Sequence, residues 1–167
     1  WLATNHGQEA SVWLITWKKT HPEKYLSTGE VLDALLCFGW IDGIRRKLDD
    51  DRTMQLIAPR QVQHWSKTYK DSAARLEAAG RMTDAGRAAI AASKANGSWH
   101  FLDDVDALIV PDDLAAALTA GDWEEYAPSY RRNVLRWIKL AKTPGTRAKR
   151  VAEAAAATAE GRKIPQM

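Results

Sequence analysis

One stretch, residues 37–60, constrains the fold of this chain more than any other part of it. An apolar helical pattern ends at Gly39, because glycine readily adopts the conformation that terminates a helix. From residue 40 to residue 48 the side chains then alternate with the period of a strand. The three aspartates 49–51 favour a tight turn, and residues 53–58 form a returning strand closed by Pro59. The stretch therefore predicts a β-hairpin that follows a helix.

A third strand and several helices complete the predicted fold. Residues 11–17 are short and rich in β-branched and aromatic side chains, which is typical of a strand. The helical patterns have N-caps at Ser27 or Thr28, near Ser66, and at Thr83, Ser129 and Thr146, with Pro111 in the first turn of a further helix. We expect an α+β fold that is mostly helical, with a small three-stranded antiparallel sheet near the N-terminus followed by helical hairpins.

Two domains are predicted from the spacing of these elements. Residues 1–100 form an N-terminal α+β domain with the sheet, the β-hairpin and a helical hairpin, and residues 108–167 form a C-terminal helical module. The small apolar faces of the helices after Ser66 and Thr83 predict that these two pack closely together. Eight tryptophans are many for this length, and we expect most of them in the core.

The charge is unevenly distributed although the net charge is only +3. Residues 129–167 hold ten Lys and Arg against two Glu, whereas residues 1–128 carry a net negative charge. The basic end either meets an anionic partner or packs against the acidic segments Asp103-Asp104, Asp112-Asp113 and Glu124-Glu125. The small net charge makes a nucleic-acid partner the less favoured of these readings.

The chain also gives indications about its compartment. Cys37 is its one cysteine, so an intrachain disulfide is excluded and an oxidising compartment is not implied. No run of 18 apolar residues is present, so no membrane span is predicted, and no signal peptide is recognised. Trp1 resembles the middle of an element, so we expect a preceding segment. We expect a cytoplasmic protein, and the oligomeric state stays open.

No pattern for catalysis or for a cofactor stands out. The glycines near Trp40 lack the spacing of a phosphate-binding loop and precede a strand rather than a helix. The four histidines are scattered without a second ligand at metal spacing, and no serine lies in a nucleophile elbow. We therefore predict no catalytic residue, no metal site and no cofactor.

The hairpin offers the best candidate binding site. Strict alternation places Asp42 on one strand face with Trp40, Ile44, Arg46 and Leu48. A buried carboxylate needs a partner, so one interpretation is a structural Asp–Arg pair that fixes the sheet to the helices. The other interpretation is a polar pocket that binds a small anionic or aromatic ligand or a peptide. If this pocket is catalytic, the protein is an enzyme of unknown class that uses Asp42 with Arg46 or Arg60. The predicted pocket residues are Trp40, Asp42, Arg46, Gln55, Arg60, Trp65 and Lys67.

A second constellation is the basic helix that follows Ser129. Arg131, Arg132, Arg136 and Lys139 are its candidate nucleic-acid contacts. Its aromatic residues, Tyr130 and Trp137, lie on the apolar stripe and are therefore expected in the core rather than on bases.

Several motifs, taken in order, resemble those of one bacterial family. They are Cys37-Phe38-Gly39-Trp40-Ile41-Asp42-Gly43, Ile57-Ala58-Pro59-Arg60, Trp65-Ser66-Lys67, Gly80-Arg81-Met82-Thr83 with Gly86, Val110-Pro111 with Leu114, Tyr130-Arg131-Arg132, and Ala141-Lys142-Thr143-Pro144 with Thr146-Arg147. Together they are similar to the YdeI/OmpD-associated family along nearly the whole chain, with residues 110–163 resembling its separable module.

This resemblance implies a role rather than a reaction. The family label speaks of protection against bacteriocins and cationic antimicrobial peptides and of association with an outer-membrane porin, which makes a periplasmic setting the alternative location. We therefore expect a non-catalytic protein that binds a small ligand or peptide and contributes to antimicrobial-peptide or stress tolerance. The enzyme and the nucleic-acid binder are the alternatives.

Overall fold

The computed structural model of this protein describes residues 1–165. These residues form two compact units that divide between Phe101 and Leu102. Helices account for 48% of these residues and strands for 14%, and the strands form one antiparallel sheet near the N-terminus. The predicted fold class, α+β and mostly helical, is therefore confirmed.

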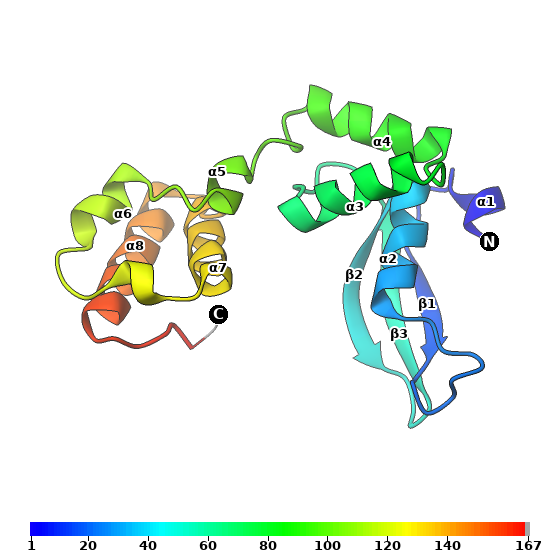
Figure 1. Ribbon diagram of the computed structural model, residues 1–167, viewed down its shortest axis with the longest axis horizontal. Coiled ribbons are helices and arrows are strands. Elements are labelled where there is room, and N and C mark those ends of the chain that lie inside the picture. Colours follow the sequence, from blue (N-terminus) through cyan, green and yellow to red (C-terminus); the bar gives the residue numbers. More distant parts are fainter. Residues whose placement is uncertain (166–167) are drawn as a thin grey trace. The chain divides into compact units, whose positions relative to one another are not determined.

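Unit 1 is built from a three-stranded sheet and the helices that cover one face and one end of it (Figure 1). Its elements are α1 (Leu2–Asn5), β1 (Val12–Trp17), α2 (Thr28–Cys37), β2 (Trp40–Lys47), β3 (Arg52–Pro59), α3 (Lys67–Ala78) and α4 (Asp84–Ala95). The strand order is β1-β3-β2, so β3 is central and both β1 and β2 are edge strands. The helix α2 begins with a complete capping box, in which Ser27 and Glu30 exchange hydrogen bonds.

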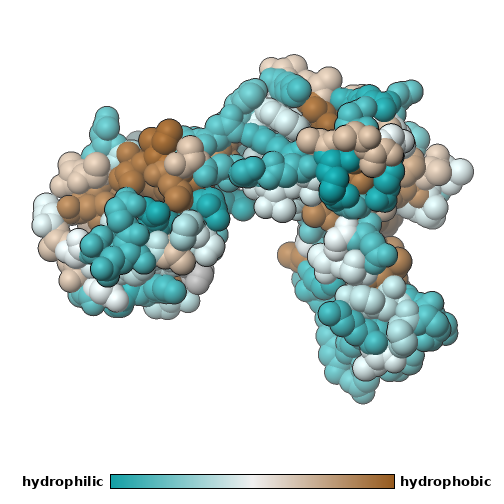
Figure 2. Space-filling model, viewed as in Figure 1, coloured by the Kyte–Doolittle hydropathy of each residue, from teal (hydrophilic) through white to brown (hydrophobic). Residues whose placement is uncertain are grey.

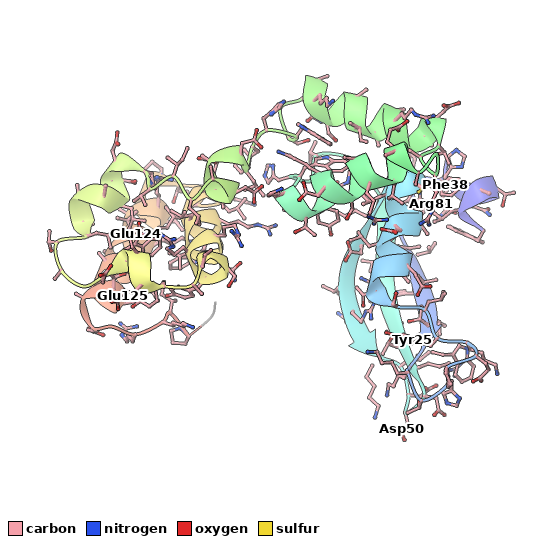
Figure 3. The ribbon with its side chains drawn as sticks, in the orientation of Figure 1. Tyr25, Phe38, Asp50, Arg81, Glu124 and Glu125 are labelled. Atoms are coloured by element: carbon pink, nitrogen blue, oxygen red, sulfur yellow. The ribbon has the colours of Figure 1, made fainter. Side chains whose placement is uncertain are left out.

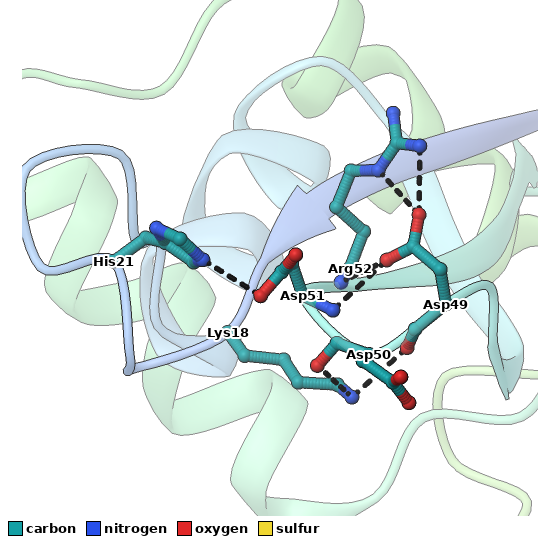
Figure 4. Close-up of polar contacts among 6 residues, drawn as sticks. All are labelled: Lys18, His21, Asp49, Asp50, Asp51 and Arg52. Carbon is teal, nitrogen blue, oxygen red and sulfur yellow. Dashed lines mark hydrogen bonds and ion pairs between the residues drawn. The ribbon is translucent and has the colours of Figure 1, made fainter.

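The predicted aspartate turn closes the hairpin. Asp49 Oδ1 accepts hydrogen bonds from the backbone N–H groups of Asp51 (3.0 Å) and Arg52 (2.6 Å), which is how aspartate stabilises a tight turn. Lys18 and His21 bind the same turn from the chain that follows β1 (Figure 4). Hydrophilic residues cover this end of the sheet (Figure 2), and Figure 3 shows Asp50 there beside the loop that carries Tyr25.

A β-bulge interrupts the alternation that the sequence predicts for β2. Asp42 pairs with Ile57, but Arg45 rather than Ile44 pairs with Gln55, so the register shifts by one residue at Gly43 and Ile44. Beyond the bulge every side chain changes face. The prediction that Arg46 shares a face with Asp42 was therefore wrong, and Arg45 takes that place.

Helix α2 supports the whole of unit 1 because it buries two faces. Val31 and Leu35 pack with Trp40 and Ile57 against the sheet. On its other side α2 contributes Leu36 and Cys37 to a second apolar cluster, shared with Trp65, Ala73, Leu76 and Met82. The glycine positions make this close packing possible, since a Cβ at Gly86 would lie 2.5 Å from the Cys37 carbonyl oxygen.

The helices α3 and α4 follow one another through a short link, but they do not pack closely on each other. Each packs mainly on α2 instead. A cleft of about 400 Å³ lies between them and is lined by small residues such as Ala73, Ala74 and Ala91. The close packing predicted from their alanine faces was therefore wrong: α3 buries Leu76 in the cluster that it shares with α2, and α4 approaches α2 closely through Gly86.

The described part of unit 2, residues 102–165, contains helices and no strand. It contains α5 (Asp103–Asp106), α6 (Asp112–Ala117), the 3₁₀ helix η1 (Trp123–Glu125), α7 (Pro128–Lys139) and α8 (Pro144–Ala159). Tyr130, Val134 and Ile138 of α7 are buried, as their spacing predicts. The caps differ from expectation, because α7 begins at Pro128 without a side-chain cap and Thr143 caps α8 in place of Thr146. Within residues 1–165 no helix combines the length and apolarity needed to cross a bilayer.

The tryptophans are less buried than we expected. Trp40, Trp65 and Trp123 lie in the core. Trp1 and Trp13, by contrast, are 59% and 40% exposed, which the sequence did not indicate.

Candidate functional site

Four of the predicted pocket residues, Asp42, Gln55, Arg60 and Trp65, lie together where the sheet meets α3. Both carboxylate oxygens of Asp42 accept hydrogen bonds, Oδ1 from the Tyr69 hydroxyl (2.5 Å) and Oδ2 from Gln55 Nε2 (3.2 Å). Gln55 Oε1 accepts in turn from Arg45 Nη2 (2.6 Å). This chain of bonds joins β2, β3 and α3. It links the sheet to the helices as the structural interpretation expected, but through Tyr69 and Gln55; among the described residues Asp42 forms no ion pair with an arginine, so the predicted Asp–Arg pair was wrong.

Arg60 is the most deeply buried charge of this cluster, with 8% of its surface exposed. Its guanidinium lies over the Trp65 ring at 3.9 Å and near the Tyr69 ring at 5.0 Å. Nη1 donates to the Gln63 carbonyl oxygen (3.2 Å), whereas Nε and Nη2 find no partner among the described residues. Burial lowers the pKa of Arg60 to about 10, and the nearby Tyr69 and Asp42 partly oppose this shift.

The remaining predicted pocket residues lie elsewhere in unit 1. Arg46 projects from the opposite face of the sheet, over the Trp13 ring at 5.5 Å. Trp40 is fully buried against α2 and donates from Nε1 to the His6 carbonyl oxygen (2.9 Å). Lys67 is exposed on α3 and pairs with Asp71. Binding of a ligand by the cluster around Asp42 stays a prediction.

In unit 2 the basic helices pair with the acidic segments. Arg131 pairs with Glu124, Lys139 with Asp104 at 2.6 Å, and Arg147 with Asp113 at 2.7 Å. Each of the three acidic segments thus meets one basic side chain, as the packing interpretation predicts. Of the four candidate nucleic-acid contacts, Arg131 and Lys139 are engaged in these pairs. Arg132 is half-buried and Arg136 is exposed.

The titratable residues give no sign of a metal centre. No three His, Cys, Asp or Glu side chains among residues 1–165 are grouped so that they could hold an ion. The Cys37 thiol is buried, and this burial raises its pKa.

The feature that the sequence did not reveal is a groove between α2 and β1, which we call the α2–β1 groove. It encloses about 570 Å³ and is lined by Trp1, Leu2, Val12, Trp13, Leu14, Ile15, Leu26, Glu30, Val31, Ala34, Leu35 and Ile57. None of the predicted pocket residues belongs to it. Four consecutive residues of β1 line it, although neighbours in a strand point to opposite faces. The backbone edge of β1 itself therefore forms one wall.

The two edge strands of the sheet differ in how they are protected. β2 carries a bulge and the exposed cations Arg45, Arg46 and Lys47, which are common defences against pairing with another strand. β1 has neither a bulge nor a charged side chain in its sequence Val-Trp-Leu-Ile-Thr-Trp, and Ile15 is 50% exposed. The lack of charge in residues 12–17 is the one signal by which the sequence could have indicated an open edge.

Comparison with known families divides the chain in two. Residues 1–89 match the model of a domain of unknown function, DUF8412, and residues 107–161 match the model described as bacteriocin-protection, YdeI or OmpD-associated. Neither the comparison with curated proteins nor that with solved structures gives a match. The resemblance predicted along nearly the whole chain is therefore confined to its C-terminal part. Because the first model covers more than half of the chain, this protein belongs to the DUF8412 family and carries a YdeI/OmpD-associated domain in its second half.

Proposed function

We propose that this protein is a non-catalytic peptide-binding protein that takes up an extended segment along β1, in the α2–β1 groove. The observation that carries the proposal is an uncharged, unprotected edge strand beside an apolar groove of about 570 Å³. Addition of a strand to a sheet edge is a common way in which proteins recognise peptides: the backbone supplies affinity and the flanking pockets supply selectivity.

The backbone geometry of β1 supports this mode of binding. Trp17 pairs outward with Tyr25 in a parallel bridge, so the outer edge already accepts one residue of the chain itself. Outward-facing backbone groups recur at every second residue of a strand. Trp13 and Ile15 therefore direct their N–H and C=O groups away from β3, toward an incoming peptide.

The groove wall indicates what kind of peptide fits. Leu14, Val31 and Leu35 offer apolar contacts to alternate side chains of the added strand. Glu30 is the one charged residue of the lining, and its hydrogen bonds with Ser27 lower its pKa, so it is ionised at neutral pH. A peptide that alternates apolar and cationic residues is complementary to this wall.

The second half of the chain supports a biological setting for such binding. The model it matches is described as bacteriocin-protection. Capture of antimicrobial peptides, many of which are apolar and cationic, would connect the α2–β1 groove with that description. Tolerance to antimicrobial peptides is accordingly the role that we propose.

Titration with a fluorescent peptide of alternating valine and lysine, about eight residues long to match a strand of this sheet, tests the proposal. We expect saturable binding that weakens about tenfold when Ile15→Lys places a cation on the edge of β1. Ile44→Lys is the matched control, since Ile44 is similarly exposed, at 54%, but lies on β2. This control should bind like the parent chain.

A second peptide separates strand addition from general adhesion. Methylation of alternate backbone nitrogens removes the donors that would pair with β1 while the side chains stay the same. We expect the methylated peptide to bind far more weakly. The proposal would be refuted if both peptides bound equally well, or if Ile15→Lys and Ile44→Lys lost the same affinity. It would also be refuted if the chain associated with itself through β1 in place of binding the peptide.

A further inference from the structure

The cleft between α3 and α4 is a second concave apolar surface of unit 1, separate from the α2–β1 groove. Its volume of about 400 Å³ lies within the range of small-molecule sites. Its lining is mainly apolar and comes from Ala73, Ala74, Ile90, Ala91 and Trp99. Because alanine side chains are short, the space between the two helices stays open rather than being filled by the chain.

Two lysines, one from each helix, converge on the indole at this cleft. Lys70 Nζ of α3 lies 5.5 Å from the centre of the Trp99 ring, and Lys94 Nζ of α4 lies 5.1 Å from it. Both lysines line the cleft. The indole therefore presents an apolar, planar surface beside two ammonium groups.

The other charged residues of the lining compensate one another. Arg87 Nε donates to both oxygens of Glu77 at 3.1 Å, and Arg87 also pairs with Asp84 just outside the cleft. The lining thus contains three cations and one carboxylate, which leaves it net positive. Such a surface favours a ligand with a negative group at one end of an apolar body.

We propose that the cleft between α3 and α4 binds a small organic anion with a flat apolar body, such as an aromatic carboxylate. The body lies on Trp99 between the two alanine faces, and the carboxylate is oriented toward Lys94. This site is independent of the peptide-binding function proposed above, because it shares no lining residue with the α2–β1 groove.

Calorimetric titration with 2-naphthoate, compared with the uncharged 2-naphthylmethanol, tests this inference. We expect naphthoate to bind more tightly than the alcohol, and Lys94→Gln to weaken the binding of naphthoate about threefold without affecting the binding of the alcohol. Lys67→Gln is the matched control, since Lys67 lies exposed on α3 outside the lining. Added salt should lower the affinity of the parent chain for naphthoate until it approaches the affinity for the alcohol, because salt screens only the charge interaction.

Filling the cleft gives a test that does not depend on charge. Ala91→Leu keeps good helix propensity at an exposed position that lines the cleft, so the variant should fold normally and bind naphthoate at least about tenfold more weakly. Ile15→Lys should bind naphthoate like the parent chain. The inference would be overturned if naphthoate did not bind, or if the acid and the alcohol bound with equal affinity. It would also be overturned if Ala91→Leu bound naphthoate as the parent chain does, or if Ile15→Lys lost this binding.

Discussion

Removal of a single hydroxyl, by Tyr69→Phe, should reveal how strongly Asp42 ties the sheet to α3. The Tyr69 hydroxyl donates to Asp42 Oδ1 at 2.5 Å, and the ring contacts Trp65 and Arg60. Phenylalanine retains these ring contacts and removes only the donor. A hydrogen bond to a charged group contributes roughly 1.5–3 kcal/mol, and Asp42 is only half-buried, so we expect a loss of about 1.5–2 kcal/mol.

Urea unfolding followed by tryptophan fluorescence can measure this loss, since six of the eight tryptophans lie in unit 1. In an Asp42→Ala background the same Tyr69→Phe change should cost less than about 0.5 kcal/mol, because the acceptor is already gone. Tyr25→Phe, in the segment after β1, is the control and should cost about as little, because no hydrogen bond of its hydroxyl to the described residues is lost. A full loss in both backgrounds, or no loss in either, would show that the Asp42–Tyr69 bond does not fix the sheet.

Three other predictions concern unit 1. Gly86→Ala should lower the free energy of unfolding by about 3 kcal/mol, because its Cβ would lie 2.5 Å from the Cys37 carbonyl oxygen. The control Gly145→Ala meets nothing within 4 Å and should be tolerated. Calorimetric unfolding of both variants measures the difference. Hydrogen bonds from the Ser27 side chain and backbone lower the pKa of Glu30, so its ionised form stabilises the fold above the unfolded pKa of about 4.3 and this contribution disappears as the pH falls through the lower folded value. The stability difference between the parent chain and Glu30→Gln should therefore be present at neutral pH and shrink in acid, and a difference that grows in acid would contradict the capping box. Burial raises the pKa of the Cys37 thiol, so alkylation by iodoacetamide should be slow in the native chain and follow unfolding as urea is added, and rapid native labelling would contradict this.

The sequence was most informative where the structure depends on neighbouring residues. The aspartate turn, the capping box at Ser27 and the cap at Thr83 all involve groups within three residues of one another. The turn and the Thr83 cap were predicted, and the N-cap of α2 was predicted at Ser27 or Thr28. The charge asymmetry was also readable, but the sequence left two interpretations of it open, and the ion pairs Arg131–Glu124 and Lys139–Asp104 of the structure favour packing between the basic and acidic segments.

The candidate site was only partly predictable for a related reason. Asp42, Gln55, Arg60 and Trp65 were brought together by the hairpin and the turn after it, as their order in the chain suggests. The bulge at Gly43 and Ile44 was not predicted, although a glycine inside a strand often marks one, and it exchanges Arg45 for Arg46. Tyr69 was missed because its partner is on another element, and a tyrosine on an apolar helical stripe resembles any core residue.

What the sequence determined by itself was most of the longer helices, the three strands and the turn chemistry of the hairpin, because these depend on side-chain period and local hydrogen bonds. Only the tertiary structure decided that β3 is the central strand, which leaves uncharged β1 at an edge and opens the α2–β1 groove. It also decided that α3 and α4 pack on α2 and leave their alanine faces apart. Both outcomes depend on which of several apolar faces packs against a given helix or strand. The sequence does not specify this choice, because it depends on the packing of the whole unit.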